Sequence, residues 1–264
     1  MNQDWTDKIV IVTGGGGGMG QAAAKRFARA GARVFVFGRT PASLAEVCAG
    51  EPRIVPVVCD VADRESVSSA VAEVAREGTP FVLVHTAGIN TPDRFMAHAD
   101  PSKIASGETW ERILDINIMG VVNMIHAVTP LMAAAGGGRI VVVSSTAAHG
   151  YDSFAGVPYT ASKWAVHGLL FTARQQLNAQ GIVISEYAPG ESNTPIVDKR
   201  PVLPTPEHRA AMIRCEECGE ALFFMASLPH SMSLIHMPIY QPFGGMPPQI
   251  NSPWIPGMEI KPKA

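Results

Sequence analysis

The chain has 264 residues, of which 47% are hydrophobic and 17% charged, and its formal net charge is −2. A chain of this length can bury a core large enough to fold without disulfides or a structural metal. The near-neutral charge shows no basic stripe of the kind that binds nucleic acid. The four cysteines are few and irregularly spaced, which indicates reduced intracellular thiols: Cys48, Cys59, Cys215 and Cys218.

The N-terminal region shows no targeting or membrane signal. Its first apolar run, Ile9–Val12, is short and stops at a glycine-rich loop. No stretch approaches the roughly 18 apolar residues that a membrane span needs. We therefore expect a soluble, cytoplasmic protein that contacts neither membrane nor nucleic acid.

Short apolar runs alternate with helical patterns along most of the chain. In chain order, strands are predicted at Lys8–Thr13, Arg33–Phe37, Ile54–Cys59, Pro80–His85, Arg139–Ser144 and Ile182–Tyr187. Helices are predicted at Gly20–Ala30, Ala42–Ala49, Ser66–Glu77, Trp110–Ala133, Tyr159–Ala179 and Pro206–Ser227. Continuous apolar strands, each followed by a helix, predict a single α/β domain over residues 1–264. Its doubly wound parallel sheet should carry helices on both faces and bind ligands at the carboxyl ends of its strands.

Two long connections interrupt this alternation. Asn90–Thr109 is polar and Glu191–Pro206 is rich in proline, and each follows a strand. Loops of this length in a compact domain are usually functional. We expect both at the ligand side of the sheet, with residues 191–212 forming a lid over the substrate and residues 246–264 forming an irregular tail.

A glycine-rich loop, TGGGGGMG, occupies Thr13–Gly20 between the first strand and the first helix. Glycines let the backbone approach a pyrophosphate closely, and the N-terminus of the next helix offers free N–H groups and a positive dipole end. A flexible turn is the alternative, which the position after a buried strand disfavours. The run fits both a TGxxxGxG and a TGxxGxxG spacing, so it does not select one type of loop. We predict cofactor contacts from Gly14, Gly16, Gly17, Gly18, Met19 and Gly20.

Arg39 and Thr40 follow the second strand, about 20 residues beyond the glycine loop. An acidic residue in this region binds the ribose 2′-OH of NAD, whereas an arginine suits the 2′-phosphate of NADP. The planar guanidinium can also stack on adenine. A solvated loop arginine is the alternative. We predict NADP as the cofactor and keep NAD as the second candidate.

Tyr159 and Lys163 are four residues apart in PYTASKWAVHG, so a helix places them on one face. A free tyrosine has a pKa near 10, about 3 units too high for an efficient base, and lowering it that far needs roughly 4 kcal/mol. A neighbouring ammonium favours the phenolate. Tyr159 can then take the proton of an alcohol, or return it to a carbonyl oxygen. A packed tyrosine beside a solvated lysine is the alternative.

The order of motifs resembles the short-chain dehydrogenase/reductase family in its compact, single-domain branch, from about Asp7 to Gly245. A YxxxK match is common by chance, but seven features in one order are specific. The resemblance implies a Rossmann fold and an enzyme that transfers a hydride between NADP(H) and a secondary alcohol or ketone. The motifs are the glycine loop, Asp60-Val61, Ala87-Gly88, Asn117 in LDINIMG, Ser145, YTASK, and Pro189-Gly190 with Thr194.

By this resemblance, the catalytic residues are Asn117, Ser145, Tyr159 and Lys163. Ser145, rather than the preceding Ser144, would bind the substrate oxygen, Lys163 would hold the nicotinamide ribose, and Asn117 would anchor a water. Alternatively, Asn117 could be a buried amide of the core. Asp60 could instead cap the helix that follows it. The resemblance also implies a homo-oligomer, a tetramer or a dimer, and further cofactor contacts from Asp60, Val61, Ala87, Gly88, Tyr159, Lys163, Pro189, Gly190 and Thr194.

The chain departs from the family at several places. His85-Thr86 stands where the family usually has two asparagines, and we interpret His85 as a structural residue at the end of its strand. The last strand, IYQPFGG, carries Phe243 where an aspartate is typical. Asn90–Thr109 is also longer than usual. These differences leave the substrate open between ketones, polyols, sugars and hydroxy acids.

The substrate pocket is expected between Ala147–Phe154, Tyr187–Gly190 and the lid. Its polar contacts could include His149 and Tyr151. Basic residues in or beside the long loops could hold a carboxylate, sulfonate or phosphate, although solvated loop charges are the alternative: Arg94, Lys199, Arg200 and Arg209.

Cys215 and Cys218, with His208 upstream, do not complete a zinc site, because no second cysteine pair exists. We therefore predict no metal. Two other functions remain open: an isomerase or dehydratase that reoxidises its own cofactor, and a cofactor-sensing protein without turnover.

Overall fold

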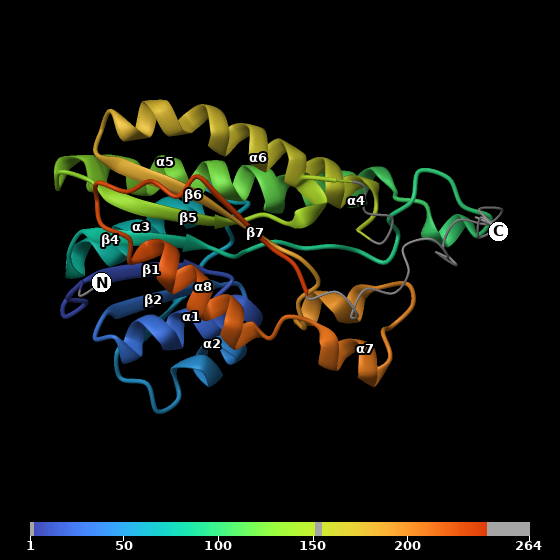
Figure 1. Cartoon of the computed structure of the whole chain (residues 1–264), viewed down its shortest axis with the longest axis horizontal. Helices are drawn as coiled ribbons and strands as arrows, with labels where there is room; N and C mark the ends of the chain where they lie inside the picture. The colour runs from blue at the N-terminus through green and yellow to red at the C-terminus, as the bar shows by residue number, and fades with distance from the viewer. Residues whose placement is uncertain (1–2, 151–154, 242–264) are drawn as a thin grey trace, which may run out of the picture.

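The computed structural model describes residues 3–150 and 155–241, which form one parallel sheet with helices on both faces (Figure 1). The seven strands lie in the order β3-β2-β1-β4-β5-β6-β7, so the strand order reverses between β1 and β4. Such a reversal opens a crevice at the carboxyl ends of the strands. The strands are β1 Ile9–Thr13, β2 Arg33–Gly38, β3 Ile54–Val58, β4 Pro80–His85, β5 Gly138–Val143, β6 Ile182–Pro189 and β7 His236–Ile239.

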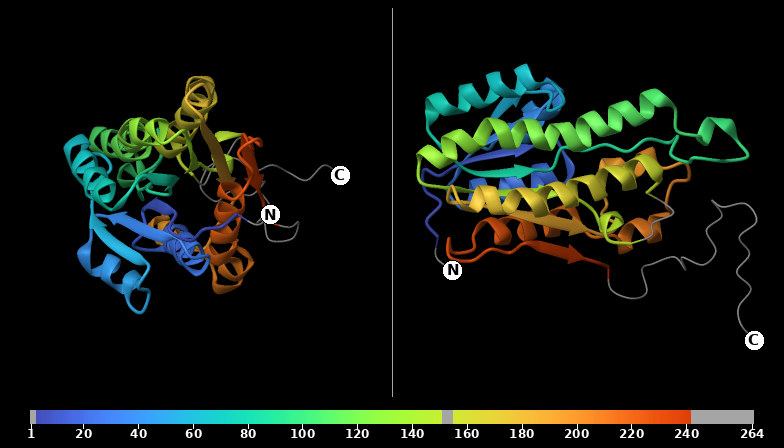
Figure 2. Two further views of the ribbon diagram at one scale, coloured as in Figure 1. Left: turned by 90° about the vertical axis from the view of Figure 1, so that its left-hand side faces the viewer. Right: turned by 90° about the horizontal axis from the view of Figure 1, so that it is seen from above.

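The two faces of the sheet carry separate apolar cores. Val10 and Val12 of β1 pack with Phe27 of α1 and Leu222 of α8, whereas Ile11 faces the side covered by α3, α5 and α6. Figure 2 shows these helical layers on opposite sides of the strands. Burial on both faces explains why the strands are continuously apolar. The helices are α1 Gly18–Arg29, α2 Pro41–Cys48, α3 Arg64–Glu77, α4 Gly107–Leu114, α5 Gly120–Ala134, α6 Val157–Asn178, α7 Pro206–Ala211 and α8 Cys215–Ala226.

The predicted α/β architecture and the six predicted strands, here β1 to β6, are confirmed, with ends shifted by at most two residues. The predicted last strand begins too late, because β7 starts at His236. Of the predicted strand, only Ile239 belongs to β7, and Tyr240 and Gln241 follow it without strand structure. The rest of that prediction, including Phe243, and the predicted tail 246–264 lie outside the described residues. The same holds for Tyr151.

One predicted helix is interrupted and another is wrong. The helix predicted at Trp110–Ala133 consists of α4 and α5 joined by a π-helical turn, Asp115–Met119. The helix predicted at Pro206–Ser227 is two helices, because the backbone of Ile213 leaves the helical path to pair with the lid. Its N–H donates to Glu191 O and its carbonyl accepts from Asn193.

The combined helix Gly107–Ala134 is long and apolar enough by composition to cross a membrane, but half of its most apolar window is buried in the fold. This burial is typical of a core helix. The apolar side chains of this helix pack against the sheet, and Met124 and Val128 are completely buried.

Candidate active site

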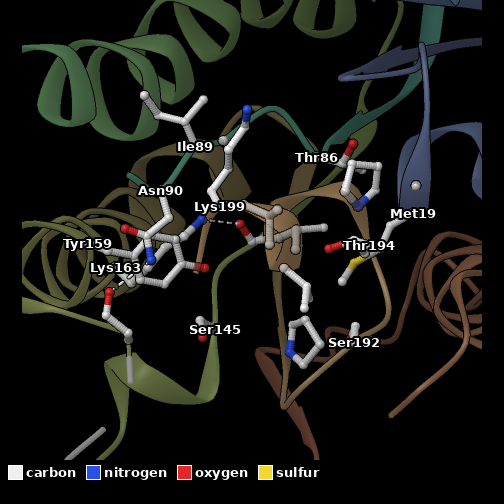
Figure 3. Close-up of a pocket in the computed structure, with 18 of the residues that line it drawn as sticks. Met19, Thr86, Ile89, Asn90, Ser145, Tyr159, Lys163, Ser192, Thr194 and Lys199 are labelled. Atoms are coloured by element: carbon white, nitrogen blue, oxygen red, sulfur yellow. Dashed lines mark hydrogen bonds between the residues drawn. The ribbon is translucent and has the colours of Figure 1, made fainter. Parts of the chain in front are cut away.

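A cavity of about 910 Å³ lies at the carboxyl ends of the strands. It is walled by the loops after β1, β4, β5 and β6, by the start of α6 and by the lid. Figure 3 shows Tyr159 and Lys163 on one side of it and Met19 and Thr194 on the other. The predicted site residues that line it are Gly14, Gly16, Gly17, Gly18, Met19, Gly20, Arg39, Ala87, Gly88, Ser145, Tyr159, Lys163, Pro189, Gly190 and Thr194.

The glycine loop is shaped for an anion. Gly17 precedes α1 and no side chain caps that helix, so its first N–H groups face the cavity. A Cβ on Gly17 would meet nothing within 4 Å, whereas a Cβ on Gly20 would lie 2.4 Å from Gly14 O and 2.6 Å from Thr86 Oγ1. Gly14 and Gly20 therefore close the turn, and Gly17 leaves room for a ligand. A pyrophosphate fits this cradle of free N–H groups.

Lys163 is 4% exposed, and its Nζ donates to Val143 O at 3.1 Å. The same atom lies 5.5 Å from the centre of the Tyr159 ring. Burial lowers the pKa of Lys163 to about 8, although the Glu186 carboxylate opposes this shift. The side chain therefore stays mostly protonated at neutral pH, and a poorly solvated ammonium lies beside the tyrosine.

The two serines after β5 have different surroundings. Ser145 lines the cavity, and its Oγ accepts from the backbone N–H of Ala147 at 3.1 Å. Ser144 also borders the cavity but is only 2% exposed; its Oγ donates to Glu186 Oε1 and accepts from the N–H of Ser145. Ser144 is thus engaged in the interior, and its contacts hold the backbone of Ser145.

Asn117 lies in the π-helical turn, is 1% exposed, and does not line the cavity. Its Oδ1 accepts from Ile89 N at 2.8 Å, while Nδ2 donates to Ile89 O at 3.1 Å and to Ser162 Oγ at 3.0 Å. Both amide hydrogens are therefore used. The side chain joins the loop after β4 to α6, directly behind the wall that carries Tyr159 and Lys163.

His85 is fully buried beneath the cavity. Its Nδ1 lies 3.1 Å from Thr13 Oγ1, and burial, assisted by the charge of Lys163, lowers its pKa to about 3. Thr86 Oγ1 donates to Thr13 O at 2.7 Å and Ala87 N donates to Thr13 Oγ1 at 3.2 Å. A neutral His85 and Thr86 thus join β4 to β1, which agrees with a structural role.

Comparison with known proteins identifies this arrangement. The family model for short chain dehydrogenases matches residues 8–202. The chain belongs to the short-chain dehydrogenase/reductase family.

Several known proteins are similar to this family member. The short-chain reductase protein NovJ of Streptomyces niveus is 34% identical, over 73% of this chain and 72% of NovJ. Sulfoacetaldehyde reductase 2 of Chromohalobacter salexigens is 30% identical, over 84% and 89%. The structure of a short-chain type dehydrogenase/reductase from Mycobacterium ulcerans superposes with a TM-score of 0.79 at 24% identity, covering 90% of each chain. The protein is therefore an oxidoreductase that acts on CH–OH or carbonyl groups with a nicotinamide nucleotide.

Arg39 lines the cavity, is half exposed and lies 3.9 Å from Asp60 Oδ2. Asp60 Oδ1 accepts from Ala62 N at 3.0 Å, and Asp63, not Asp60, caps α3. Asp60, Val61 and Thr40 do not line the cavity. Val61 is 6% exposed and packs against Gly120.

Several residues of the predicted lid segment, 191–212, line the cavity, and the segment is held by several polar contacts. Glu191 binds Arg200 at 2.8 Å and His208 at 2.7 Å, and Arg94 Nη2 donates to Lys199 O at 2.9 Å. Arg94, Lys199 and Arg200 line the cavity, together with Arg112 of α4, which no sequence pattern indicated.

Other expected lining residues lie elsewhere. Tyr187 is fully buried and points into the core, because it alternates with Glu186 and Ala188 along β6; the expectation that it lines the pocket is wrong. Ala147 is buried as well. Arg209 pairs with Asp198 outside the cavity, and His149 contacts Glu186 instead of the cavity.

Neither cysteine of the 215–218 pair is arranged as a metal ligand. Cys215 Sγ lies 3.1 Å from Asn193 O, and burial raises its pKa to about 11. Burial also raises the pKa of Cys218. Both thiols therefore stay protonated and help to join α8 to the lid.

Proposed function

We propose that Tyr159 is the general acid–base of a hydride transfer between NADP(H) and a secondary alcohol or ketone. One observation carries this proposal. Tyr159 and Ser145 line the same cavity as the glycine loop, and the buried ammonium of Lys163 lies beside the tyrosine ring. A cofactor cradle, a proton donor and a hydrogen-bond donor to oxygen thus share one enclosed space.

Each side chain has a distinct task in carbonyl reduction. The N–H groups at the start of α1 bind the pyrophosphate, and Lys163 Nζ holds the nicotinamide ribose. The nicotinamide supplies the hydride when the cofactor is bound. Ser145 Oγ donates a hydrogen bond to the carbonyl oxygen, and Tyr159 Oη gives that oxygen a proton. The Lys163 ammonium stabilises the phenolate that remains.

Asn117 acts as a positioning residue in this proposal. Its amide fixes Ile89 and Ser162, and Ser162 Oγ donates to Tyr159 O at 2.7 Å. The turn of α6 that carries Tyr159 is thereby fastened to the loop after β4. A shift of this turn would misplace the phenol relative to the substrate, which costs rate steeply.

The substrate end of the cavity favours a carbonyl compound with an anionic group. Lys199 and Arg112 line the cavity, and neither makes an ion pair with any described residue. One relative, sulfoacetaldehyde reductase 2, is named for a carbonyl compound that carries a sulfonate. Arginine and lysine bind such groups through charge-assisted hydrogen bonds.

A substrate panel assayed with wild type and Tyr159→Phe tests the mechanism. We expect NADPH-dependent reduction of at least one ketone by wild type, and a loss of kcat of at least about a hundredfold in Tyr159→Phe at unchanged melting temperature. An unimpaired Tyr159→Phe enzyme would refute the role of the phenol. Cofactor binding without turnover across the whole panel would instead support a sensing protein.

The remaining expectations belong to the same proposal. We infer a cytoplasmic enzyme with one domain over residues 1–264, acting as a homo-oligomer, a tetramer or a dimer. NADP is the proposed cofactor because Arg39 lines the cavity together with the glycine loop, where its guanidinium could bind a 2′-phosphate. NAD, with a polyol, sugar or hydroxy acid, is the alternative.

A further inference from the structure

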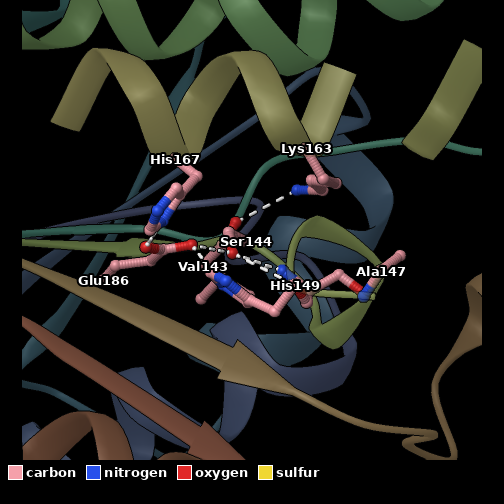
Figure 4. A network of polar contacts seen from close by, with 8 residues as sticks. Val143, Ser144, Ala147, His149, Lys163, His167 and Glu186 are labelled. Atoms are coloured by element: carbon pink, nitrogen blue, oxygen red, sulfur yellow. Dashed lines mark hydrogen bonds and ion pairs between the residues drawn. The ribbon is translucent and has the colours of Figure 1, made fainter. Parts of the chain in front are cut away.

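A histidine–glutamate cluster lies behind the active site and has no task in the function proposed above. Glu186 on β6 is 2% exposed. His149 Nε2 lies 3.2 Å from its Oε1, and His167 Nδ1 lies 2.6 Å from its Oε2. Figure 4 shows the three side chains meeting between α6 and the sheet. One ligand atom from each lies within 4.8 Å of the others.

A third histidine reaches the same place from β7. His236 is paired in register with Glu186 on the neighbouring strand. Its ring centre is 4.1 Å from that of His149 and 5.8 Å from that of His167. Its Nε2 is buried and has no hydrogen-bond partner among the described residues. A buried polar atom without a partner is unfavourable, so hydrogen bonds alone leave the cluster incomplete.

The donor set matches a particular class of ion. Imidazole nitrogen and carboxylate oxygen bind zinc at about 2.0–2.2 Å, which places neighbouring ligands of a tetrahedral site about 3.3 Å apart. The 3.2 Å between His149 Nε2 and Glu186 Oε1 agrees with this spacing. Nitrogen-rich sites favour zinc and similar transition metals over magnesium and calcium, which prefer oxygen. A pocket of about 10 Å³ borders the cluster and is lined in part by His167, Phe171 and Glu186.

We propose that His149, His167 and Glu186 bind one divalent transition-metal ion of the zinc class, with water completing the four-coordinate site and His236 beside it. The three ligands come from the loop after β5, from α6 and from β6, and His236 approaches from β7. No short sequence motif contains them, and the expectation of no metal rested on the cysteine pair alone. Only the fold brings these four side chains together.

The metal site has a direct connection to Ser145. Glu186 Oε1 accepts from Ser144 Oγ, and Ser144 Oγ accepts from the N–H of Ser145. A metal ion that takes Glu186 as a ligand competes with Ser144 for the same carboxylate. Ser145 then loses part of its support, so metal occupancy lowers kcat. This consequence depends on the proposed function, whereas metal binding itself does not.

Calorimetric titration of the tag-free, metal-stripped protein with Zn²⁺ tests the site without cofactor or substrate. We expect one ion per chain, and at least about tenfold weaker binding in His149→Gln and in His167→Gln. Two controls should bind like wild type: His126→Gln, which changes an exposed histidine on α5, and Cys215→Ser, which removes the cysteine pair. No stoichiometric binding, unchanged binding by His167→Gln, or loss in Cys215→Ser would overturn the proposal.

Cobalt substitution of wild type keeps the test independent of whether the variants fold. Co²⁺ at this site should give the visible bands of a four-coordinate nitrogen–oxygen complex without a thiolate charge-transfer band. A thiolate band, or the spectrum of free hexa-aqua Co²⁺, would contradict the proposed ligands.

Turnover measured during the same Zn²⁺ titration tests the connection to Ser145. The kcat of wild type should fall as the site fills and recover with a chelator, and His167→Gln should need at least about tenfold more Zn²⁺ for the same effect. Zinc binding at full stoichiometry with unchanged kcat would overturn the connection. An enzyme that binds Zn²⁺ but shows no activity at any metal level would instead contradict the function proposed for the cavity.

Discussion

At the scale of single residues, Lys163 combines a proposed catalytic role with a cost in stability. Its folded pKa of about 8 lies below the ordinary 10.5, because burial disfavours the charged form. The unfolded chain therefore binds more protons between these values, and this contribution to the free energy of unfolding rises as the pH rises from about 8 to 10.5. At neutral pH the lowered pKa of Lys163 corresponds to a reduction of roughly 3 kcal/mol in the free energy of unfolding.

We predict that Lys163→Met abolishes turnover and raises stability at pH 7 by about 1–3 kcal/mol, since part of the gain is lost with the hydrogen bond to Val143 O. The advantage should shrink as the pH approaches 10.5. Denaturant unfolding across this pH range measures it, with Lys25→Met on α1 as a control that shows no such trend. A destabilised Lys163→Met at neutral pH would contradict the prediction.

Arg39 is the residue that should decide the cofactor. If its guanidinium binds the 2′-phosphate, Arg39→Ala should weaken NADPH binding by about tenfold or more and NADH binding little. The substitution also frees Asp60, which now lies 3.9 Å away. Fluorescence titration with both nucleotides measures the ratio. Equal losses for the two nucleotides would show that Arg39 does not recognise the phosphate.

At the scale of elements, different glycines of the loop between β1 and α1 should matter for folding and for cofactor binding. A Cβ on Gly20 would collide with the backbone of Gly14, whereas a Cβ on Gly17 would project into open space from an extended backbone that alanine also adopts. We predict that Gly20→Ala lowers the melting temperature by several degrees. Gly17→Ala should keep the melting temperature of the cofactor-free protein but bind NADPH at least about tenfold more weakly. Thermal unfolding with and without cofactor distinguishes the two; a destabilised Gly17→Ala would be the contrary result.

At the scale of the whole molecule, α6 presents an apolar stripe to solvent. Val157, Trp164 and Phe171 are 40%, 50% and 58% exposed and are spaced seven residues apart, so they share one face. Contiguous exposed apolar surface of this kind marks an interface. If the proposed homo-oligomer forms through this face, Trp164→Glu with Phe171→Glu should give a smaller species than wild type in sedimentation velocity. Phe224→Glu, at an exposed position on α8, should leave the mass unchanged; dissociation by the control alone would place the interface elsewhere.

Much of the fold and the position of the glycine loop at the cavity were predictable, because both depend on local patterns. The strands are apolar throughout because both of their faces are buried. The glycine loop is recognisable because its tight turn requires several residues without side chains close together in the sequence. The break between α7 and α8 was not predictable, since Ile213 leaves the helix only to pair with Glu191 and Asn193 of the lid. Arg112 is a similar case: α4 places it at the cavity, but nothing in its neighbours in the sequence indicates a ligand.

The sequence by itself determined the parallel sheet, the glycine cradle and the Tyr159–Lys163 pair. Each of these rests on residues that are close along the chain, where a period of two or of about four residues decides which side chains share a face. The tertiary structure alone decided that Asn117 fastens Ile89 and Ser162 and that Tyr187 points into the core. It also decided that His149 and His167 contact Glu186, with a third histidine on the neighbouring strand. These contacts join distant segments, and their positions follow from strand order and helix packing, which no local pattern specifies.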